Sequence, residues 1–148
     1  MGPIAQKTVA VSGGFDPVHI GHIQLFEKAR ALGDRLVIIL NNDNWLIAKK
    51  GFAFMKEKER AYVLAALRYV DEVVISGHPQ NPSDMSVCTE LKSLKPDIFA
   101  NGGDRKPDEV PVPEVSVCQR LGIKMVYNVG KSGKIQSSSE LVKKVKGK

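Results

Sequence analysis

An unbroken run of apolar residues constrains the fold of this chain more than any other feature of its sequence. Residues 36–40 read LVIIL and follow directly after Arg35. A segment this short cannot cross a bilayer, which takes about 20 residues, but it matches the length of a β-strand. A strand that is apolar on both faces is typical of a parallel sheet with helices packed on either side. The run therefore predicts a buried strand in an α/β domain.

Short apolar runs alternate with stretches of helical period, in which apolar residues recur at spacings of three or four. The helix expected over residues 20–32 would direct one apolar face inward, made of Ile20, Ile23, Phe26, Ala29 and Leu32. We expect strands over residues 7–12, 35–40, 73–75, 97–101 and 124–129. We expect helices over residues 20–32, 56–69 and 112–121, from Ser83 or Asp84 to Leu94, and from Ser137 onward, with a polar loop after Asn41.

The order of these elements predicts one domain over residues 1–148. Strands that alternate with helices favour a five-stranded, mostly parallel sheet with helices on both faces. A chain of this length can bury a sizeable core without disulfides or metals. In the helix over 56–69 we expect inward-facing side chains at Ala61, Leu64, Ala65 and Leu67.

Composition argues against several other classes of protein. The net charge of +6 owes much to four lysines between Lys143 and Lys148, and the rest of the chain is nearly balanced against 16 acidic residues. We interpret this tail as frayed and solvated rather than as an RNA-binding arm, and expect no nucleic-acid or membrane partner. The start lacks the apolar core of a signal peptide, so a cytoplasmic location is expected. Cys88 and Cys118 have no metal-ligand spacing and are expected to be buried thiols in helices.

The strongest functional motif is GGFDPVHIGH at residues 13–22, between the first predicted strand and helix. Glycines let a backbone approach a ligand, and a helix N-terminus attracts anions. His19 and His22 would project to the same side of the first turn, with Gly21 leaving room for a phosphate. Two imidazoles there can donate hydrogen bonds to phosphate oxygens during phosphoryl transfer. The alternative is one helix-capping histidine and one ordinary surface histidine.

This segment is neither a dinucleotide fingerprint nor a P-loop, because the required glycines and the Gly-Lys-Ser/Thr triplet are missing. It resembles the HxGH motif of the cytidylyltransferase-like nucleotidyltransferase superfamily. The resemblance continues, in the expected order and over nearly the whole chain, through LGDRLVIILNND, EKERAYVLAALRYVDEVV, LKPDIFANGGDRKPDEV and QSSSEL. The segment GGDRKPDE is most similar to bacterial sugar-phosphate (heptose 1-phosphate) adenylyltransferases, and glycerol-3-phosphate cytidylyltransferases are a more distant match. The resemblance implies a Rossmann-like sheet, a nucleotide bound with Mg²⁺, and a homodimer.

The resemblance also implies roles for basic residues after the second strand. Lys50 and Arg60 match family positions whose cations hold phosphates, and Lys49 stands beside the first of them. Which of the two lysines reaches a phosphate stays open, and we assign Lys49 to the acceptor. The ordinary alternatives are solvated loop lysines and, for Arg60, an ion pair within its own helix.

The serines at 137–139 match a family segment that contacts the outer phosphates of the nucleotide. They also form a helix-capping box with Glu140, and a capped N-terminus is itself an anion site. Asp16 and Asp43 are expected to bind acceptor hydroxyls or help hold Mg²⁺, or else to form turns. No protein metal site is expected, because the triphosphate would carry most of the Mg²⁺. The expected nucleotide-binding residues are Gly14, Phe15, Gly21, Asn101, Gly102, Gly103, Asp104, Ser137, Ser138 and Ser139.

These features predict an enzyme that transfers AMP from ATP to a sugar phosphate such as heptose 1-phosphate and releases pyrophosphate. The expected catalytic residues are His19, His22, Lys50 and Arg60. Ser132 stands where the related cytidylyltransferases usually have an arginine, which favours ATP. Transfer of CMP from CTP to glycerol 3-phosphate or another polyol or amino-alcohol phosphate is the alternative. A nucleotide-binding module without activity and an RNA-binding protein are rivals from other classes.

Overall fold

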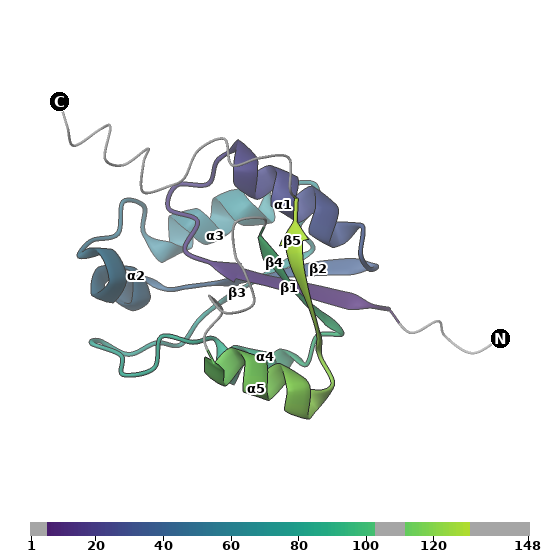
Figure 1. Ribbon diagram of the computed structural model, residues 1–148. Helices are drawn as coiled ribbons and strands as arrows, with labels where there is room; N and C mark the ends of the chain where they lie inside the picture. Colours follow the sequence, from purple (N-terminus) through teal and green to yellow (C-terminus); the bar gives the residue numbers. More distant parts are fainter. Residues whose placement is uncertain (1–5, 103–111, 131–148) are drawn as a thin grey trace.

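The computed structural model describes residues 6–102 and 112–130, and within them it confirms the α/β architecture. The strands form one sheet in the order β3-β2-β1-β4-β5, and all four neighbouring pairs are parallel. Helices α1 and α3 lie on one face, α4 and α5 on the other, and α2 lies beyond the carboxyl ends of the strands (Figure 1). In chain order the elements are β1 (Thr8–Gly13), α1 (Ile20–Arg30), β2 (Arg35–Leu40), α2 (Asp43–Lys50), α3 (Glu57–Ala65), β3 (Glu72–Ile75), α4 (Cys88–Leu94), β4 (Ile98–Gly102), α5 (Val112–Leu121) and β5 (Lys124–Val129).

The two helical layers pack against opposite faces of the same strands, because successive strand residues point to opposite sides. Val9 and Val11 of β1 pack in the core with Phe26 of α1 and Leu64 of α3. Ala10 packs instead in the core that includes α4 and α5. Residues 36–40 are all fully buried, as the apolar run predicts. Cys88 and Cys118 are free, buried and helical, which confirms their interpretation as buried thiols.

The segment after β2 differs from the prediction, because α2 stands where a polar loop was expected. The signals for this helix are nevertheless in the sequence. The Asn42 side chain accepts a hydrogen bond from the Trp45 N–H as an N-cap, and Gly51 ends the helix in the left-handed region at φ 88°. Asparagine at the start and glycine just past the end are the preferred caps.

The start of α4 was also predicted wrongly. The helix begins at Cys88, and Asp84 instead accepts a hydrogen bond from the Ser86 N–H in a local turn. On α3 Leu64 is buried and Ala61 packs against the same core, but Ala65 faces outward. The helix ends at Ala65 rather than at Tyr69, so Leu67 packs against this core from the turn that follows. On α1 the two central residues of the predicted face, Phe26 and Ala29, are fully buried, whereas the flanking Ile20 and Leu32 are exposed. The helix expected from Ser137 lies outside the described residues.

The sheet opens toward the carboxyl end between β1 and β4. The β1–β2 ladder runs through six residue pairs to Gly13 and Leu40, whereas β1 and β4 pair only at Val9–Ile98 and Ala10–Phe99. The chain also reverses its direction of winding between these two strands, since β2 and β3 lie on one side of β1, and β4 and β5 on the other. Ligands of open α/β sheets bind at such a point, beyond the carboxyl ends of the strands.

At the end of β5 the backbone comes into close contact with α1. Gly130 has φ 75°, and a Cβ atom added there would lie 2.8 Å from Leu25 Cα and 3.0 Å from Leu25 N. Real Cβ atoms essentially never come as close as 2.8 Å to another atom, and the neighbours here are main-chain atoms. Glycine is therefore required at this position for both its conformation and its small size.

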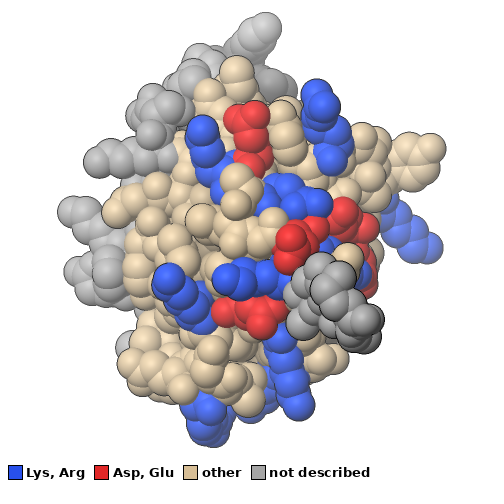
Figure 2. Space-filling model, turned by 90° about the vertical axis from the view of Figure 1, so that its right-hand side faces the viewer, with Lys and Arg blue, Asp and Glu red and all other residues tan. Residues whose placement is uncertain are grey.

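The face of the molecule near the amino ends of the strands carries charges of both signs side by side (Figure 2). The ion pairs Arg30–Asp71 and Arg35–Glu72 belong to this part of the fold. Among the described residues, no large area of one sign stands out on this face. None of the helices in residues 6–102 and 112–130 is long and apolar enough to span a membrane.

Candidate active site

The histidine loop, residues 14–19, joins the central strand β1 to α1. His19 is the N-cap of α1, and its Nδ1 accepts a hydrogen bond from the Gly21 N–H at 3.1 Å. His22 reaches back, and its Nδ1 accepts from the His19 N–H at 3.2 Å. The two rings stack with centroids 3.9 Å apart and planes 27° from parallel. This is a reciprocal capping box in which both side chains are imidazoles.

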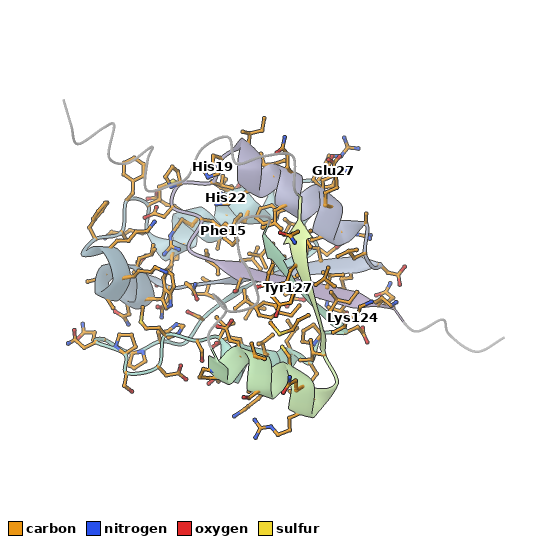
Figure 3. The ribbon with its side chains drawn as sticks, in the orientation of Figure 1. Phe15, His19, His22, Glu27, Lys124 and Tyr127 are labelled. Carbon is orange, nitrogen blue, oxygen red and sulfur yellow. The ribbon has the colours of Figure 1, made fainter. Side chains whose placement is uncertain are left out.

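These hydrogen bonds determine where the imidazoles carry their protons. A ring nitrogen that accepts a hydrogen bond has no proton of its own, so each neutral ring is protonated at Nε2. Both Nε2–H groups can therefore donate to an anion. The capping and catalytic interpretations of the motif do not exclude each other, because the cap orients the donors. Figure 3 shows both histidines at the start of α1, close to Phe15.

Phe15 supports His22 from the core. Its ring meets the His22 ring edge-on, with centroids 4.9 Å apart, and contacts Phe26 in the same manner at 5.2 Å. The residue is buried and lies in the left-handed region at φ 45°. Its aromatic side chain is part of the fold, so a role in nucleotide binding falls to its backbone.

The glycines at the start of the loop leave space for protein side chains. A Cβ on Gly14 would lie 2.8 Å from Leu46 Cδ2, and one on Gly13 would lie 2.8 Å from the Phe15 ring. These contacts give both glycines a structural reason, and close approach of a ligand to this backbone stays a prediction. Gly21, between the histidines in the first turn of α1, keeps its predicted position next to the candidate anion site.

Asp16 lies in the histidine loop but faces the protein interior. It is 2% exposed, and its two carboxylate oxygens accept hydrogen bonds from the N–H groups of Phe54 and Met55 at 2.6 and 2.7 Å. The carboxylate thus binds the segment between α2 and α3. It is not placed to read acceptor hydroxyls in this arrangement.

Arg60 is buried as well, at 1% exposure. It forms an ion pair with Asp43 at 2.7 Å and three hydrogen bonds to backbone carbonyls. The alternative ion pair within its own helix is not formed, because the partners of Arg60 come from other segments. These partners use the donors that the predicted phosphate contact would need. Asp43, the first residue of α2, is correspondingly committed to Arg60.

The two lysines at the end of α2 differ in their surroundings. Lys49 is exposed and lies over the Trp45 ring, with Nζ 4.9 Å from the centroid. Lys50 is half-buried, and burial lowers the pKa of its ammonium group, an effect that Asp16 opposes and that Lys49 and Arg60 reinforce. Asp16 belongs to the histidine loop, so a charge of this loop acts on Lys50. We therefore prefer Lys50 to Lys49 as the lysine that shares a ligand with the histidines.

A third histidine, which the sequence analysis did not single out, is structural. His78 is buried, with Nδ1 2.7 Å from Ser76 Oγ and Nε2 2.9 Å from the Ser86 carbonyl. Its own carbonyl accepts hydrogen bonds from the side chains of Asn42 and Asn44. These bonds hold the segment after β3 against the start of α2. No spacing pattern in the sequence pointed to this network.

Asn101, near the end of β4, is 2% exposed. Its Nδ2 faces the carbonyls of Phe99 and Val126 at 3.5 Å, and its Oδ1 is buried without a hydrogen-bond donor. Gly102 ends β4. The other predicted nucleotide-binding residues on this side, Gly103 and Asp104, lie outside the described residues, as do the three serines at 137–139.

The residues also bear on the Mg²⁺ that the resemblance implies. Nowhere in residues 6–102 and 112–130 do three or more His, Cys, Asp or Glu side chains group to hold a metal. Asp16 and Asp43 use carboxylate oxygens in hydrogen bonds to the protein. Mg²⁺ generally takes few protein ligands and several from waters and substrate phosphates. That the triphosphate carries most of the Mg²⁺ stays a prediction from the resemblance.

Comparison with known proteins identifies the class to which this fold and site belong. Residues 10–132 match the cytidylyltransferase-like family, and the chain is a member of it. This confirms the resemblance found in the HxGH segment.

Two groups of relatives are similar in sequence. The bifunctional protein HldE of Helicobacter pylori is 41% identical over 118 residues, which cover 78% of this chain and 24% of that protein. The FAD synthase of Pyrococcus horikoshii is 39% identical over 109 residues, covering 73% of this chain and 70% of that protein. The chain thus spans about a quarter of this HldE protein but most of the synthase.

A solved structure extends the likeness to three dimensions. The lipopolysaccharide core biosynthesis protein of Thermoplasma volcanium superposes with a TM-score of 0.69 at 31% identity, over 84% of this chain and 97% of that one. The sheet with helices on both faces is therefore the Rossmann-like fold of this family.

Proposed function

We propose that this chain is a nucleotidyltransferase that transfers a nucleoside monophosphate from an NTP to the phosphate of a small molecule, releasing pyrophosphate. The observation that carries the proposal is the reciprocally bonded pair of His19 and His22. It presents two Nε2–H donors on the first turn of α1, at the carboxyl end of the central strand. A helix N-terminus and two such donors together suit a phosphoryl group that gains charge.

In the proposed reaction an oxygen of the acceptor phosphate attacks the α-phosphorus of the NTP in line. A new P–O bond forms as the bond to the bridging oxygen breaks, and pyrophosphate leaves with the electron pair. The nucleophile is already an anion, so the chain needs no general base and forms no covalent intermediate. His19 and His22 stabilise charge on the α-phosphoryl group, and Lys50 binds a phosphate. Bound Mg²⁺ would supply further charge neutralisation on the triphosphate.

We propose three further parts of the site from the sequence resemblance. The serines at 137–139 would hold the leaving pyrophosphate. Residues 101–104, at the end of β4, would line the pocket of the base and ribose. Lys49 would serve the acceptor. A homodimer and a cytoplasmic location are expected on the same grounds.

We propose AMP as the transferred group and a sugar 1-phosphate such as heptose 1-phosphate as the first acceptor. The segment GGDRKPDE and the similarity to HldE support this choice. A flavin phosphate is the second candidate, because the FAD synthase of P. horikoshii is matched over most of its length. Both candidates use ATP. Transfer from CTP to a polyol or amino-alcohol phosphate is the alternative that changes the nucleotide.

Thermal unfolding with Mg²⁺ and each of ATP, CTP, GTP and UTP tests the nucleotide first. A ligand that binds the native state raises the midpoint, so ATP should give the largest shift. Pyrophosphate release is then measured with heptose 1-phosphate, other sugar 1-phosphates, FMN and glycerol 3-phosphate. A larger shift with CTP would overturn the choice of ATP. Nucleotide binding without turnover on any acceptor would favour the binding module.

A further inference from the structure

The Arg60 guanidinium is enclosed by the protein on all sides. Its side chain is 0% exposed, although it carries a full charge. Nε donates to the Met55 carbonyl at 2.8 Å, Nη1 to the carbonyls of Gly14 and Asn41 at 2.8 and 2.7 Å, and Nη2 to Asp43 at 2.7 Å. Four of the five N–H groups of a guanidinium are thus used within the chain. A phosphate could reach Arg60 only after these contacts had opened.

The partners of Arg60 come from three segments that build the candidate site. Gly14 begins the histidine loop. Asn41 and Asp43 flank the start of α2, the helix that ends in Lys50. Met55 belongs to residues 51–56, which connect α2 to α3 and are called the strap below. One rigid, planar group therefore holds together the segments that carry the histidines and the lysine.

Asp16 supports the same arrangement from within the histidine loop. It accepts the N–H groups of Phe54 and Met55, while Arg60 binds the carbonyl of Met55. The Met55 N–H thus donates to the Asp16 carboxylate, and the Met55 carbonyl accepts from the Arg60 guanidinium. The two side chains share no hydrogen bond with each other, but they fix the same strap residue.

The charge of Arg60 is paired within the protein. Its guanidinium forms an ion pair with Asp43, and Asp16 favours the charged form of Lys50, which Lys49 and Arg60 disfavour. Arg60 therefore needs no substrate anion as a partner, and its contacts can preorganise the site before substrate binds.

We propose that Arg60 is a positioning residue. It sets the spacing between the histidine pair and Lys50 through Gly14, Asp43 and the strap, and it makes no contact with substrate. The reaction that it serves is the one under "Proposed function", on which this inference rests. The assignment replaces the phosphate contact expected from sequence.

Two substitutions test this role, with an exposed arginine as control. Arg60→Met keeps the length of the side chain without its donors, and Arg60→Lys keeps the charge without the planar fork that reaches four acceptors. Arg68→Met makes the same change at an exposed residue that lies over the Tyr69 ring. Misplacement of reacting groups by 1 Å costs about 100-fold in rate. We expect kcat to fall by about this factor in both Arg60 variants, with the KM for the NTP changed less than about threefold.

Amide hydrogen exchange gives a readout that does not depend on turnover. The N–H groups of Phe54 and Met55 are bound by Asp16, not by Arg60, yet their exchange in Arg60→Lys should accelerate by about tenfold beyond that of the β1 amides. Asp16→Asn should have the same effect. In the double variant the losses of kcat should not add, because either substitution alone releases the strap.

A substrate contact would give the opposite pattern. Its signs are a KM for the NTP raised more than about tenfold, near-normal kcat, partial rescue by lysine and unchanged exchange of Phe54 and Met55; this result overturns the inference. If Arg60→Met does not fold, Arg60→Lys and Asp16→Asn decide the matter. If the wild-type protein transfers no nucleotide, the proposed function fails, and the exchange experiment still supports or overturns the role of Arg60.

Discussion

His22 is held by a hydrogen bond from the His19 N–H, by stacking on the His19 ring and by the edge of the Phe15 ring. The hydrogen bond uses Nδ1, whereas Nε2 is the atom that we assign to the substrate. A substitution of His22 therefore tests turnover and stability as two separate quantities.

We expect His22→Ala to lower turnover by at least about 100-fold, the effect of losing one donor to a transition-state oxyanion. The free energy of unfolding should fall by no more than about 1 kcal/mol, the size of one capping hydrogen bond. Steady-state kinetics and urea unfolding measure the two quantities. His78→Ala is the matched control, since both its ring nitrogens bond to the protein. It should lose more stability and less turnover, and near-normal turnover of His22→Ala would contradict the assignment.

Lys50 gives a prediction about pH. Burial lowers the pKa of its ammonium group, so it loses its charge at a lower pH than an exposed lysine. If the ammonium binds phosphate, kcat/KM should decline on the alkaline side below pH 10.5. Lys50→Arg should move this decline upward, whereas Lys49→Arg at the exposed neighbour should not. The same shift means that this group adds stability as pH rises from its folded pKa toward 10.5, because the unfolded chain there binds more protons.

At the scale of elements, α2 depends on its caps more than on its apolar face, since Leu46 is its buried residue. The Asn42 side chain makes two hydrogen bonds: its oxygen accepts from the Trp45 N–H, and its amide nitrogen donates to the His78 carbonyl at 2.8 Å. Asn42→Ala should destabilise the protein by about 1–2 kcal/mol through the lost cap, with a further cost for the His78 carbonyl. Urea unfolding measures the loss. Asn44→Ala, which removes a second donor to the same carbonyl but no cap, should cost less.

The predictable elements were those with an apolar pattern. Apolar runs and spacings indicate the strands and the helices α1, α3 and α5, and all of them begin within one residue of the expected position. Helix α3 ends earlier than expected, at Ala65. α2 was missed because its sequence, DNWLIAKK, buries little, so that only the caps reveal it. The start of α4 was misplaced because serine and aspartate favour local turns as readily as helix caps.

The site shows a similar division. The histidine pair is local, so a short motif contains both its residue types and its geometry. The roles of Asp16 and Arg60 depend on contacts between different segments, which span up to 46 residues of chain, and no spacing rule describes these. Sequence could indicate that these charges matter, but not that they face the protein.

At the scale of the whole molecule, the layer formed by α4 and α5 encloses both cysteines. Cys88 and Cys118 belong to the core under α4 and α5. Burial raises the pKa of the Cys118 thiol to about 11, and that of Cys88 is raised as well. Both thiols should resist a chromogenic disulfide reagent at pH 8 until urea unfolds the protein, when both should react. Rapid labelling of the native protein would contradict the packing of this layer.

The raised thiol pKa values also predict how the free energy of unfolding changes at alkaline pH. Between pH 9 and 11 the unfolded chain loses its Cys118 proton while the folded one keeps it, so stability should fall as pH rises through this window. Cys118→Ala should flatten that part of the profile. Because Lys50 acts in the opposite direction, the two contributions are separable by these single variants.

The contact of Gly130 with α1 has a genetic consequence. Any side chain at position 130 would press on the main chain of Leu25, in the middle of the helix whose first turn carries both histidines. Clashes between side chains can be relieved by trimming the partner, but every residue at position 25 has the same Cα and N atoms. Intragenic suppressors of a Gly130 substitution should therefore be rare at the contact itself. Those that arise should map to the segments at the two ends of α1, where a change can shift the whole helix.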